Sequence, residues 1–128
     1  MPRKEAFNGK LPPAIGPLSR AIRVGDTLYV SGLVGVDFEN RLGEGIEAQT
    51  RNTLEGIKSL VEAAGGSMAD VVSVTAYLAN LEDYKAFNAV YVQYFQPPLP
   101  ARATVGSQLI HKEHLIELQA VAVIGCGQ

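Results

Sequence analysis

Two stretches of the chain repeat apolar residues at helical spacing. Between residues 46 and 64 apolar side chains recur every three or four positions, and Gly65-Gly66 then supplies a stop signal. A shorter stripe starts after Asn80, which can cap a helix, and ends before Pro97, which cannot continue one. This stripe consists of Leu81, Tyr84, Asn88, Tyr91 and Phe95. The pattern predicts two helices, one over 46–64 and one between Asn80 and Pro97.

Short apolar or alternating segments before and between these helices predict strands. Residues 21–24 and 27–31 flank Gly25-Asp26, a pair typical of hairpin turns. Residues 71–78 alternate, with an apolar face made of Val72, Val74, Ala76 and Leu78. Val71 is then expected on the opposite, mixed face of the same strand.

Two more strands, at about 103–109 and 114–124, are expected after the second helix, with a turn between them. Residues 1–20 are rich in Pro and Gly and predict an extended arm without regular structure, and residues 35–45 predict a loop. The order β-β-α-β-α-β-β, with hairpins at both ends, favours an α+β fold in which both helices cover one face of a mixed sheet. No repeat or linker divides the chain, so residues 1–128 are expected to form a single domain.

The face of this sheet away from the helices has an unusual composition. It would carry Tyr29, Ser31, Ser73, Thr75, Tyr77, Glu117, Gln119, Val121 and Val123. Nearly half of these side chains are apolar or aromatic, and no remaining segment is available to cover them. Such a face commonly meets another subunit. We therefore expect an oligomer, with Glu117 and Gln119 in or near its interface.

The length and the charge of the chain argue against several classes of protein. The chain of 128 residues is long enough to bury a core, and its formal net charge of −2 offers no basic stripe for nucleic acid. No apolar run approaches the ~18 residues of a membrane span, and the N-terminus leads into no signal-peptide core. The single cysteine, Cys126, fits a reducing compartment. We expect a cytoplasmic protein that binds neither nucleic acid nor membrane.

Arg102 and Glu117 are the charged residues that stand out. Arg102 follows Pro100-Ala101 at the start of an apolar segment, and Glu117 lies inside an otherwise apolar one. Burying either charge costs free energy unless it is paired or used. Arginine can grip a carboxylate through two parallel hydrogen bonds, and glutamate can orient or deprotonate water. The pair predicts a pocket that holds a small carboxylate and hydrolyses something attached to it. A structural ion pair between neighbouring strands is the alternative.

The other candidate residues are weaker signals. Asn88 is polar on an otherwise apolar stripe, and Ser31-Gly32 ends a strand where a ligand could approach the backbone; a polar core residue and an ordinary strand end are the alternatives. His111 and His114 lie in a turn without a third zinc ligand nearby, so we expect them to be solvated rather than bound to metal. Cys126 has no evident base beside it and is not expected to act as a nucleophile.

Several short motifs together resemble those of the Rid/YjgF family of reactive-intermediate (enamine/imine) deaminases. They are Ala14-Ile15-Gly16-Pro17, Val30-Ser31-Gly32, Ala48-Gln49-Thr50-Arg51, Val61-Glu62-Ala63-Ala64-Gly65, Phe87-Asn88-Ala89-Val90-Tyr91, Pro100-Ala101-Arg102 and Ile116-Glu117-Leu118-Gln119-Ala120-Val121-Ala122. The likeness extends over nearly the whole chain. It implies a chorismate-mutase-like α+β fold and a homotrimer, in which the sheets form a barrel-like core and the sites lie between subunits.

The resemblance also implies a reaction. It is the hydrolysis of 2-imino or 2-enamino acids, such as 2-iminobutanoate and 2-iminopropanoate, to 2-keto acids and ammonia, without cofactor or metal. The family's carboxylate-binding arginine falls on Arg102 and its water-orienting glutamate on Glu117. Its helix asparagine falls on Asn88, and its Ser-Gly pair on Ser31-Gly32. Arg102 and Glu117 would then be catalytic, and Asn88, Ser31 and Gly32 would bind substrate.

Two substrate-binding positions depart from the family pattern. A tyrosine that commonly follows the Gly-Pro element is Leu18, and a cysteine two residues after the arginine is Thr104. These departures leave two alternatives open. One is a non-catalytic module that binds 2-keto acids and needs Arg102 but not Glu117. The other is a deaminase for a different enamine, such as 2-aminomuconate or 3-aminoacrylate, with the larger one using the room left at Leu18.

Overall fold

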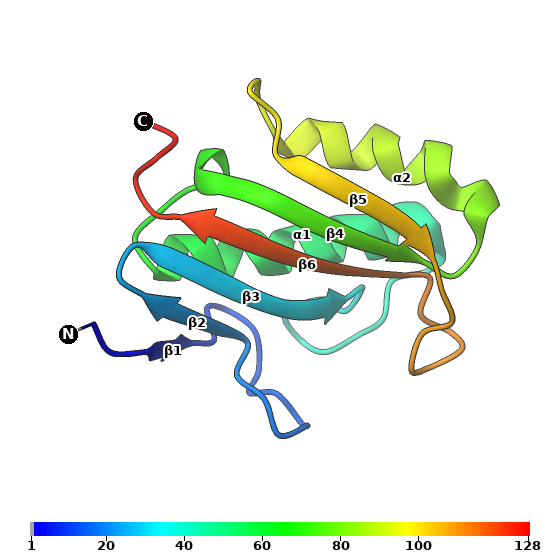
Figure 1. Ribbon diagram of the computed structural model, residues 1–128. Coiled ribbons are helices and arrows are strands. Elements are labelled where there is room, and N and C mark those ends of the chain that lie inside the picture. The colour runs from blue at the N-terminus through cyan, green and yellow to red at the C-terminus, as the bar shows by residue number, and fades with distance from the viewer. Residues whose placement is uncertain (1) are drawn as a thin grey trace.

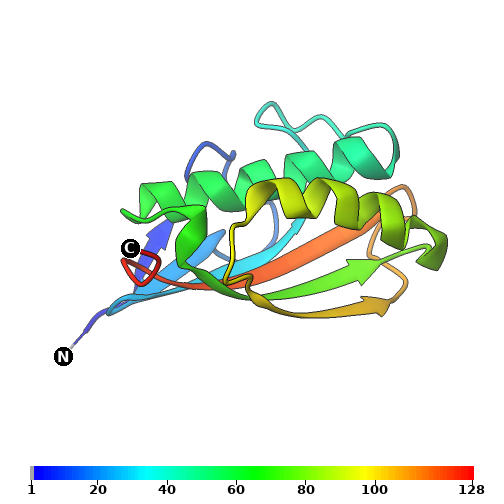
Figure 2. The same ribbon diagram turned by 90° about the horizontal axis from the view of Figure 1, so that it is seen from above.

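A computed structural model describes residues 2–128 as a twisted sheet with two helices packed against one of its faces (Figures 1 and 2). Neighbouring strands follow the order β1-β2-β3-β6-β4-β5, and the pairing is antiparallel except between β4 and β5, which run parallel. The strands are β1 (Glu5–Phe7), β2 (Ala21–Val24), β3 (Thr27–Val34), β4 (Val71–Leu78), β5 (Ala101–Gly106) and β6 (Ile116–Val123). The predicted mixed α+β sheet is confirmed.

Helix α1 (Gly45–Ala63) corresponds to the first predicted helix. Its apolar residues at helical spacing are buried against the sheet, and they include Leu54, Ile57, Leu60 and Val61. Gly65 ends the helix with a φ of +93°, a conformation that costs glycine little. Its N–H and that of Gly66 donate to the carbonyls of Glu62 and Val61, at 3.0 and 2.9 Å.

The second helical segment is shorter than the apolar stripe predicts. Helix α2 (Tyr84–Tyr91) is flanked by the 3-10 turns η2 (Leu81–Asp83) and η3 (Val92–Tyr94), and a third turn, η1 (Met68–Asp70), precedes β4. The residues of α2 that face the core are Phe87, Val90 and Tyr91, whereas Leu81 and Tyr84 are exposed. The prediction from this stripe was therefore partly wrong. The first half of the stripe lies at the edge of the sheet, and the second half packs in the core.

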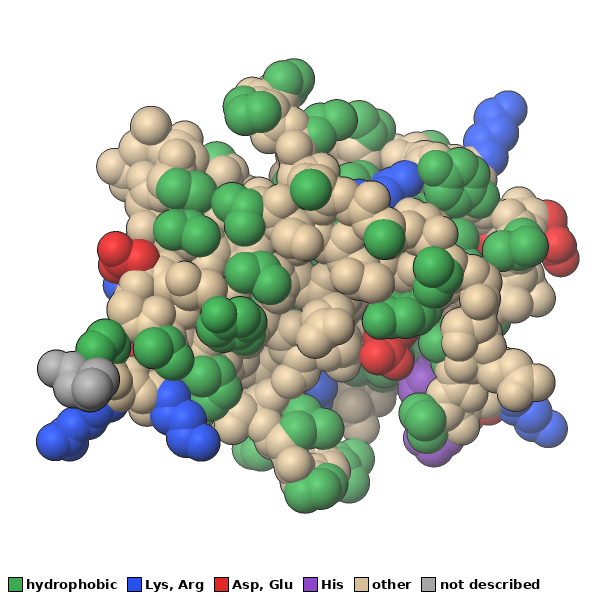
Figure 3. All heavy atoms as spheres, viewed as in Figure 1, with side chains coloured by type: hydrophobic (Ala, Val, Ile, Leu, Met, Phe, Trp, Pro, Cys, Tyr) green, Lys and Arg blue, Asp and Glu red, His purple; other side chains and the backbone are tan. Residues whose placement is uncertain are grey.

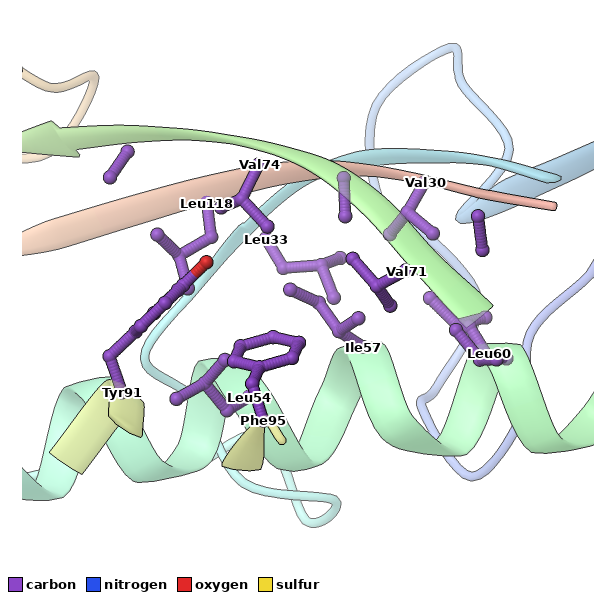
Figure 4. Packing of buried hydrophobic residues seen from close by; sticks show 14 of the residues in the cluster. Val30, Leu33, Leu54, Ile57, Leu60, Val71, Val74, Tyr91, Phe95 and Leu118 are labelled. Atoms are coloured by element: carbon purple, nitrogen blue, oxygen red, sulfur yellow. The ribbon is translucent and has the colours of Figure 1, made fainter. Parts of the chain in front are cut away.

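The core lies between the helices and the sheet. Figure 4 shows side chains of the strands pointing toward α1, among them Val30, Leu33, Val74 and Leu118. Tyr91 and Phe95 enter the same layer beside Leu54, and their rings are 4.7 Å apart between centroids. This layer fixes the position of α2 against the sheet, and so fixes the side chains that α2 directs toward β5.

The hairpin predicted for the last two strands is wrong. β6 lies between β3 and β4, and β5 pairs with the outer edge of β4. Alternate residues of β6 are buried on the helix side, as suits a central strand; these residues are Ile116, Leu118, Ala120 and Ala122. β5 is largely exposed and suits the edge of the sheet.

Two smaller expectations also need correction. Residues 1–20 were expected to lack regular structure, but Glu5–Phe7 pairs with β2 at one sheet edge. Leu11, further along this segment, is buried in the hydrophobic core. In β4 a register shift near its start exchanges the faces of two valines. Val71 is 5% exposed and Val72 39%, the reverse of what strict alternation predicts.

No helix or strand within residues 2–128 covers the face of the sheet opposite the helices, as expected. Tyr29 is exposed there, and Thr75, Tyr77 and Val121 are partly exposed. Figure 3 views this open face: hydrophobic side chains are spread across it, and most charged side chains lie at its rim. No helix within the described residues is long and apolar enough to cross a membrane.

Candidate functional site

Arg102 lies on β5 with its side chain on the helix side of the sheet. It pairs in register with Val74, which is buried under the helices. Its guanidinium carbon is 4.7 Å from the centre of the Tyr91 ring and 5.1 Å from that of Phe87. Aromatic rings at this distance attract the cation. Arg102 also lines a pocket of about 430 Å³ with Leu78, Leu81, Tyr84, Thr104 and Val105.

Tyr84 and Asn88 of α2 lie beside this guanidinium. Nη2 of Arg102 donates a hydrogen bond to the Tyr84 hydroxyl at 3.2 Å. The side-chain amide of Asn88 and the Arg102 charge together lower the pKa of Tyr84, because both stabilise its phenolate. Burial instead raises the pKa of Tyr91, and Arg102 partly opposes this. The predicted residues Arg102, Asn88 and Thr104 therefore lie in one group, which we call the Arg102 pocket.

Thr104 follows Arg102 on the same face of β5 and lines the same pocket. Its hydroxyl oxygen is buried and has no hydrogen-bond partner within residues 2–128. A buried hydroxyl without a partner is destabilising by about 1–3 kcal/mol. The Tyr91 hydroxyl is in the same condition. Polar atoms of this kind beside a cation leave hydrogen-bonding capacity for a small polar ligand.

Glu117 lies on the open face of the sheet. Its register partners are Tyr77 on β4 and Val34 on β3, and its two neighbours on β6, Ile116 and Leu118, are buried under the helices. The carboxylate rests over Gly32, where β3 contains a register shift. A Cβ at Gly32 would come 2.9 Å from the carboxyl carbon of Glu117, so only glycine leaves room for this arrangement.

Ser31 connects Glu117's surroundings to the N-terminal arm. The Ser31 hydroxyl donates to the carbonyl of Ser19, and the Ser31 N–H donates to that of Arg20 at 2.9 Å. Leu18, the neighbour of Ser19, is 53% exposed. The predicted residues Ser31, Gly32 and Glu117 therefore form a second group, and Leu18 lies on the arm that Ser31 binds.

A loop, residues 107–115, borders Glu117. Four of its residues, Ser107–Ile110, enclose about 200 Å³ with Tyr77 and Glu117. The buried amide of Gln49 on α1 anchors the far end of this loop: it donates to the carbonyl of Glu113 at 3.2 Å and accepts from the N–H of Leu115 at 2.8 Å. The same amide donates to Gly43 at 3.1 Å, so Gln49 joins two loops.

His111 and His114 lie in the same loop, with ring centres 5.0 Å apart. Burial and the neighbouring His111 lower the pKa of His114. Among residues 2–128 no three His, Cys, Asp or Glu side chains are placed to hold a metal ion.

The two groups of predicted residues do not meet within one chain. Arg102 is in register with Val74 and Glu117 with Tyr77, and residues three apart on β4 point to opposite faces of the sheet. β4 also separates the two strands, so the alternative of an ion pair between neighbouring strands is wrong. The expectation of one pocket holding both side chains is not met by a single chain.

Sequence reasoning missed the residues that surround Arg102. Tyr84 and Tyr91 were members of the apolar stripe, with Asn88 between them, but were interpreted only as a helix face. The spacing of four and three residues around a polar Asn88 was the available signal. The loop residues beside Glu117 had no comparable pattern in the sequence.

Comparison with known proteins places this geometry in a family. A family model described as Endoribonuclease L-PSP matches residues 9–124. A RutC family protein of Pyrococcus abyssi is 41% identical over 124 residues, which is 95% of this chain and 98% of that protein. A 2-iminobutanoate/2-iminopropanoate deaminase of Dermatophagoides farinae is 38% identical over 88% of this chain and 90% of its own.

A solved structure agrees with this result. The crystal structure of RidA from an Antarctic Psychrobacter species superposes with a TM-score of 0.88 and 39% identity, over 93% of this chain and 98% of the other. Both the sequence and the arrangement of the strands and helices are thus shared. The chain belongs to the Rid/YjgF family.

Proposed function

We propose that this protein hydrolyses 2-imino acids such as 2-iminobutanoate and 2-iminopropanoate to 2-keto acids and ammonia. Relatives that are 34–38% identical over most of the chain have the name 2-iminobutanoate/2-iminopropanoate deaminase. The observation that supports the proposal most directly is Arg102, a cation held against aromatic rings at the wall of a pocket of about 430 Å³. A planar guanidinium in such a position suits a small carboxylate.

The proposed site needs two copies of the chain. Arg102 and Glu117 lie on opposite faces of one sheet, so one chain cannot direct both side chains at one small molecule. The open face with Tyr77 and Val121 offers an apolar surface for a second subunit. We infer a homotrimer in which the Arg102 pocket of one subunit meets Glu117 and the Leu18 arm of its neighbour.

The chemistry follows from these two groups. Arg102 binds the carboxylate of the substrate and so fixes the position of the adjacent C=N carbon. Glu117 accepts a proton from a water molecule as the water oxygen bonds to the carbon of the protonated imine, which gives a tetrahedral amino alcohol. The same carboxyl group then gives that proton to the nitrogen. The C–N bond breaks and ammonia leaves, while Glu117 takes the proton of the hydroxyl group, whose oxygen becomes the carbonyl oxygen of the 2-keto acid. This last proton passes from Glu117 to the released ammonia or to water.

Two substitutions test the proposal. 2-Iminobutanoate is generated from threonine by a dehydratase, and its decay is followed with and without the protein. Glu117→Gln keeps the shape of the side chain but cannot accept a proton, so hydrolysis should fall by about 10²-fold or more. Calorimetry should show that this variant still binds 2-ketobutyrate.

Arg102→Lys keeps the charge but cannot form the bidentate hydrogen bonds to the carboxylate, so both hydrolysis and 2-ketobutyrate binding should be lost. A wild-type protein that binds 2-ketobutyrate but does not accelerate imine decay would instead be a 2-keto-acid-binding module. Decay of 3-aminoacrylate or 2-aminomuconate with no effect on 2-iminobutanoate would indicate a pathway deaminase with a different substrate.

A further inference from the structure

Tyr84 has a hydroxyl group that the proposed reaction does not use. It is nearly half exposed, lines the Arg102 pocket and lies on the first turn of α2. Its oxygen accepts a hydrogen bond from Nη2 of Arg102 at 3.2 Å. Asn88 follows four residues later on the same helix face, where side chains are neighbours, and its amide contributes to the lowered pKa of Tyr84.

This arrangement determines what the Tyr84 hydroxyl can still do. The guanidinium has donors only, so Arg102 can approach the phenolic oxygen only as a donor. The Asn88 contact lowers the pKa of Tyr84, as expected when the amide N–H stabilises the phenolate oxygen. Because its oxygen accepts from Arg102, the O–H of Tyr84 remains as a donor at the mouth of the pocket.

We propose that Tyr84 is a further carboxylate-binding residue: its O–H donates to the carboxylate that Arg102 holds, and Asn88 acts as a positioning residue by orienting Tyr84. This inference rests on the proposed function and adds the Tyr84 O–H as a further hydrogen-bond donor to the bound carboxylate. It also changes the role of Asn88, which was expected to touch the substrate directly. Arg102 keeps four further N–H groups for the same carboxylate.

The first test is Tyr84→Phe, which removes one oxygen atom from a partly exposed side chain and should leave folding intact. Its dissociation constant for 2-ketobutyrate should rise roughly tenfold, the value of one hydrogen bond to a charged group. The KM for 2-iminobutanoate should rise in parallel with little change in kcat, because the contact is the same in ground and transition states.

Tyr94→Phe is the matched control. The Tyr94 hydroxyl donates to Glu55 at 2.7 Å, on the α1 side and outside the pocket, so its removal loses a hydrogen bond of similar kind. This variant should bind 2-ketobutyrate as the wild type does. Equal affinities in wild type and Tyr84→Phe would overturn the proposal.

The second test separates the roles of Asn88. Asn88→Ala should weaken 2-ketobutyrate binding in the wild-type background but have no further effect in Tyr84→Phe, because it acts only through the hydroxyl. The same loss in both backgrounds would show that Asn88 contacts the ligand itself, and would overturn its proposed role in orienting Tyr84. If wild type binds 2-ketobutyrate through Tyr84 but does not hydrolyse the imine, the proposed function fails and this inference stands. If it hydrolyses the imine and Tyr84→Phe binds normally, only this inference fails.

Discussion

The two faces of the sheet are built from the same strands but are completed in different ways. On β6, Leu118 and Ala120 are buried under the helices of their own chain, whereas Glu117 and Val121 face outward from the other side. The helix side is closed by the chain itself, so its residues stabilise the fold. The open side lacks a cover within residues 2–128, so its residues are available to another molecule.

The residues of the candidate site are divided between the same two faces of the sheet. The Arg102 pocket opens on the helix side at the β5 edge, and Glu117 lies on the open face near β3. Folding and reactivity therefore have separate requirements in this chain. One molecule can bury its core alone, but it cannot bring its own cation and its own carboxylate to one substrate.

Mixing two inactive variants gives the largest expected effect. Arg102→Lys and Glu117→Gln should each be nearly inactive alone. Unfolded together and refolded as mixed trimers, about one quarter of sites should combine an intact Arg102 with an intact neighbouring Glu117, if subunits assemble at random in a ring. Imine decay should rise accordingly, to about one quarter of the wild-type rate. A mixture that remains as inactive as its components would show that each chain forms its site alone.

A charge on the open face tests the comparison next. Val121→Asp should place a carboxylate in the proposed subunit interface without touching the buried core, so the fold should persist while the proposed trimer dissociates. Light scattering should then give about 13.7 kDa instead of three times that mass. Imine hydrolysis should fall with the assembly.

Val92→Asp is the control for this charge. Val92 is also an exposed valine, but it lies on η3 in the helix layer. It should change neither mass nor activity. A Val121→Asp protein with the wild-type mass would remove the open face from the interface.

The matching change on the helix side should affect stability rather than assembly. Leu118 is fully buried, and Leu118→Ala should lower the free energy of unfolding by about 2–5 kcal/mol. Urea titrations followed by circular dichroism would measure this, with light scattering at low urea to show that the proposed trimer still forms. A loss below about 1 kcal/mol would mean that the helix-side layer repacks easily and that the two faces differ less than proposed.

The smallest expected effect comes from Gly32→Ala. The added Cβ would force the flexible end of the Glu117 side chain to move, and because a misplaced catalytic group slows the reaction, hydrolysis should fall about tenfold while 2-ketobutyrate still binds. Thermal melts of Gly32→Ala in the wild-type and Glu117→Ala backgrounds would separate the causes. An equal drop in Tm in both would assign the effect to the backbone of β3 and not to the carboxylate.

Much of the fold could be predicted from local patterns of apolar residues. Strand β4 and helix α1 follow their apolar periodicity almost to the residue, because each has one face buried in the core. The order of the strands was not readable, since whether β5 pairs with β4 or β6 depends on contacts between distant residues. The short β1 and the register shift at Val71 depend on their neighbours in the same way.

The candidate site was predictable in its members but not in its arrangement. A charged residue in an apolar strand is visible in one sequence, and so Arg102 and Glu117 could be selected. Their separation onto opposite faces depends on where β5 and β6 lie relative to β4, which no motif encodes. The contact of Tyr84 with Arg102 joins α2 to β5 and depends on the same tertiary arrangement.

The close approach of Gly32 and Glu117 also limits the order in which this chain could change by mutation. While the carboxylate rests over the backbone of β3, any side chain at Gly32 overlaps it. A lineage that loses the acid first is then free to fill Gly32. A lineage that fills Gly32 first must displace an acid still in use. The path back is harder, because restoring glutamate in a chain that has already filled this gap requires a second change.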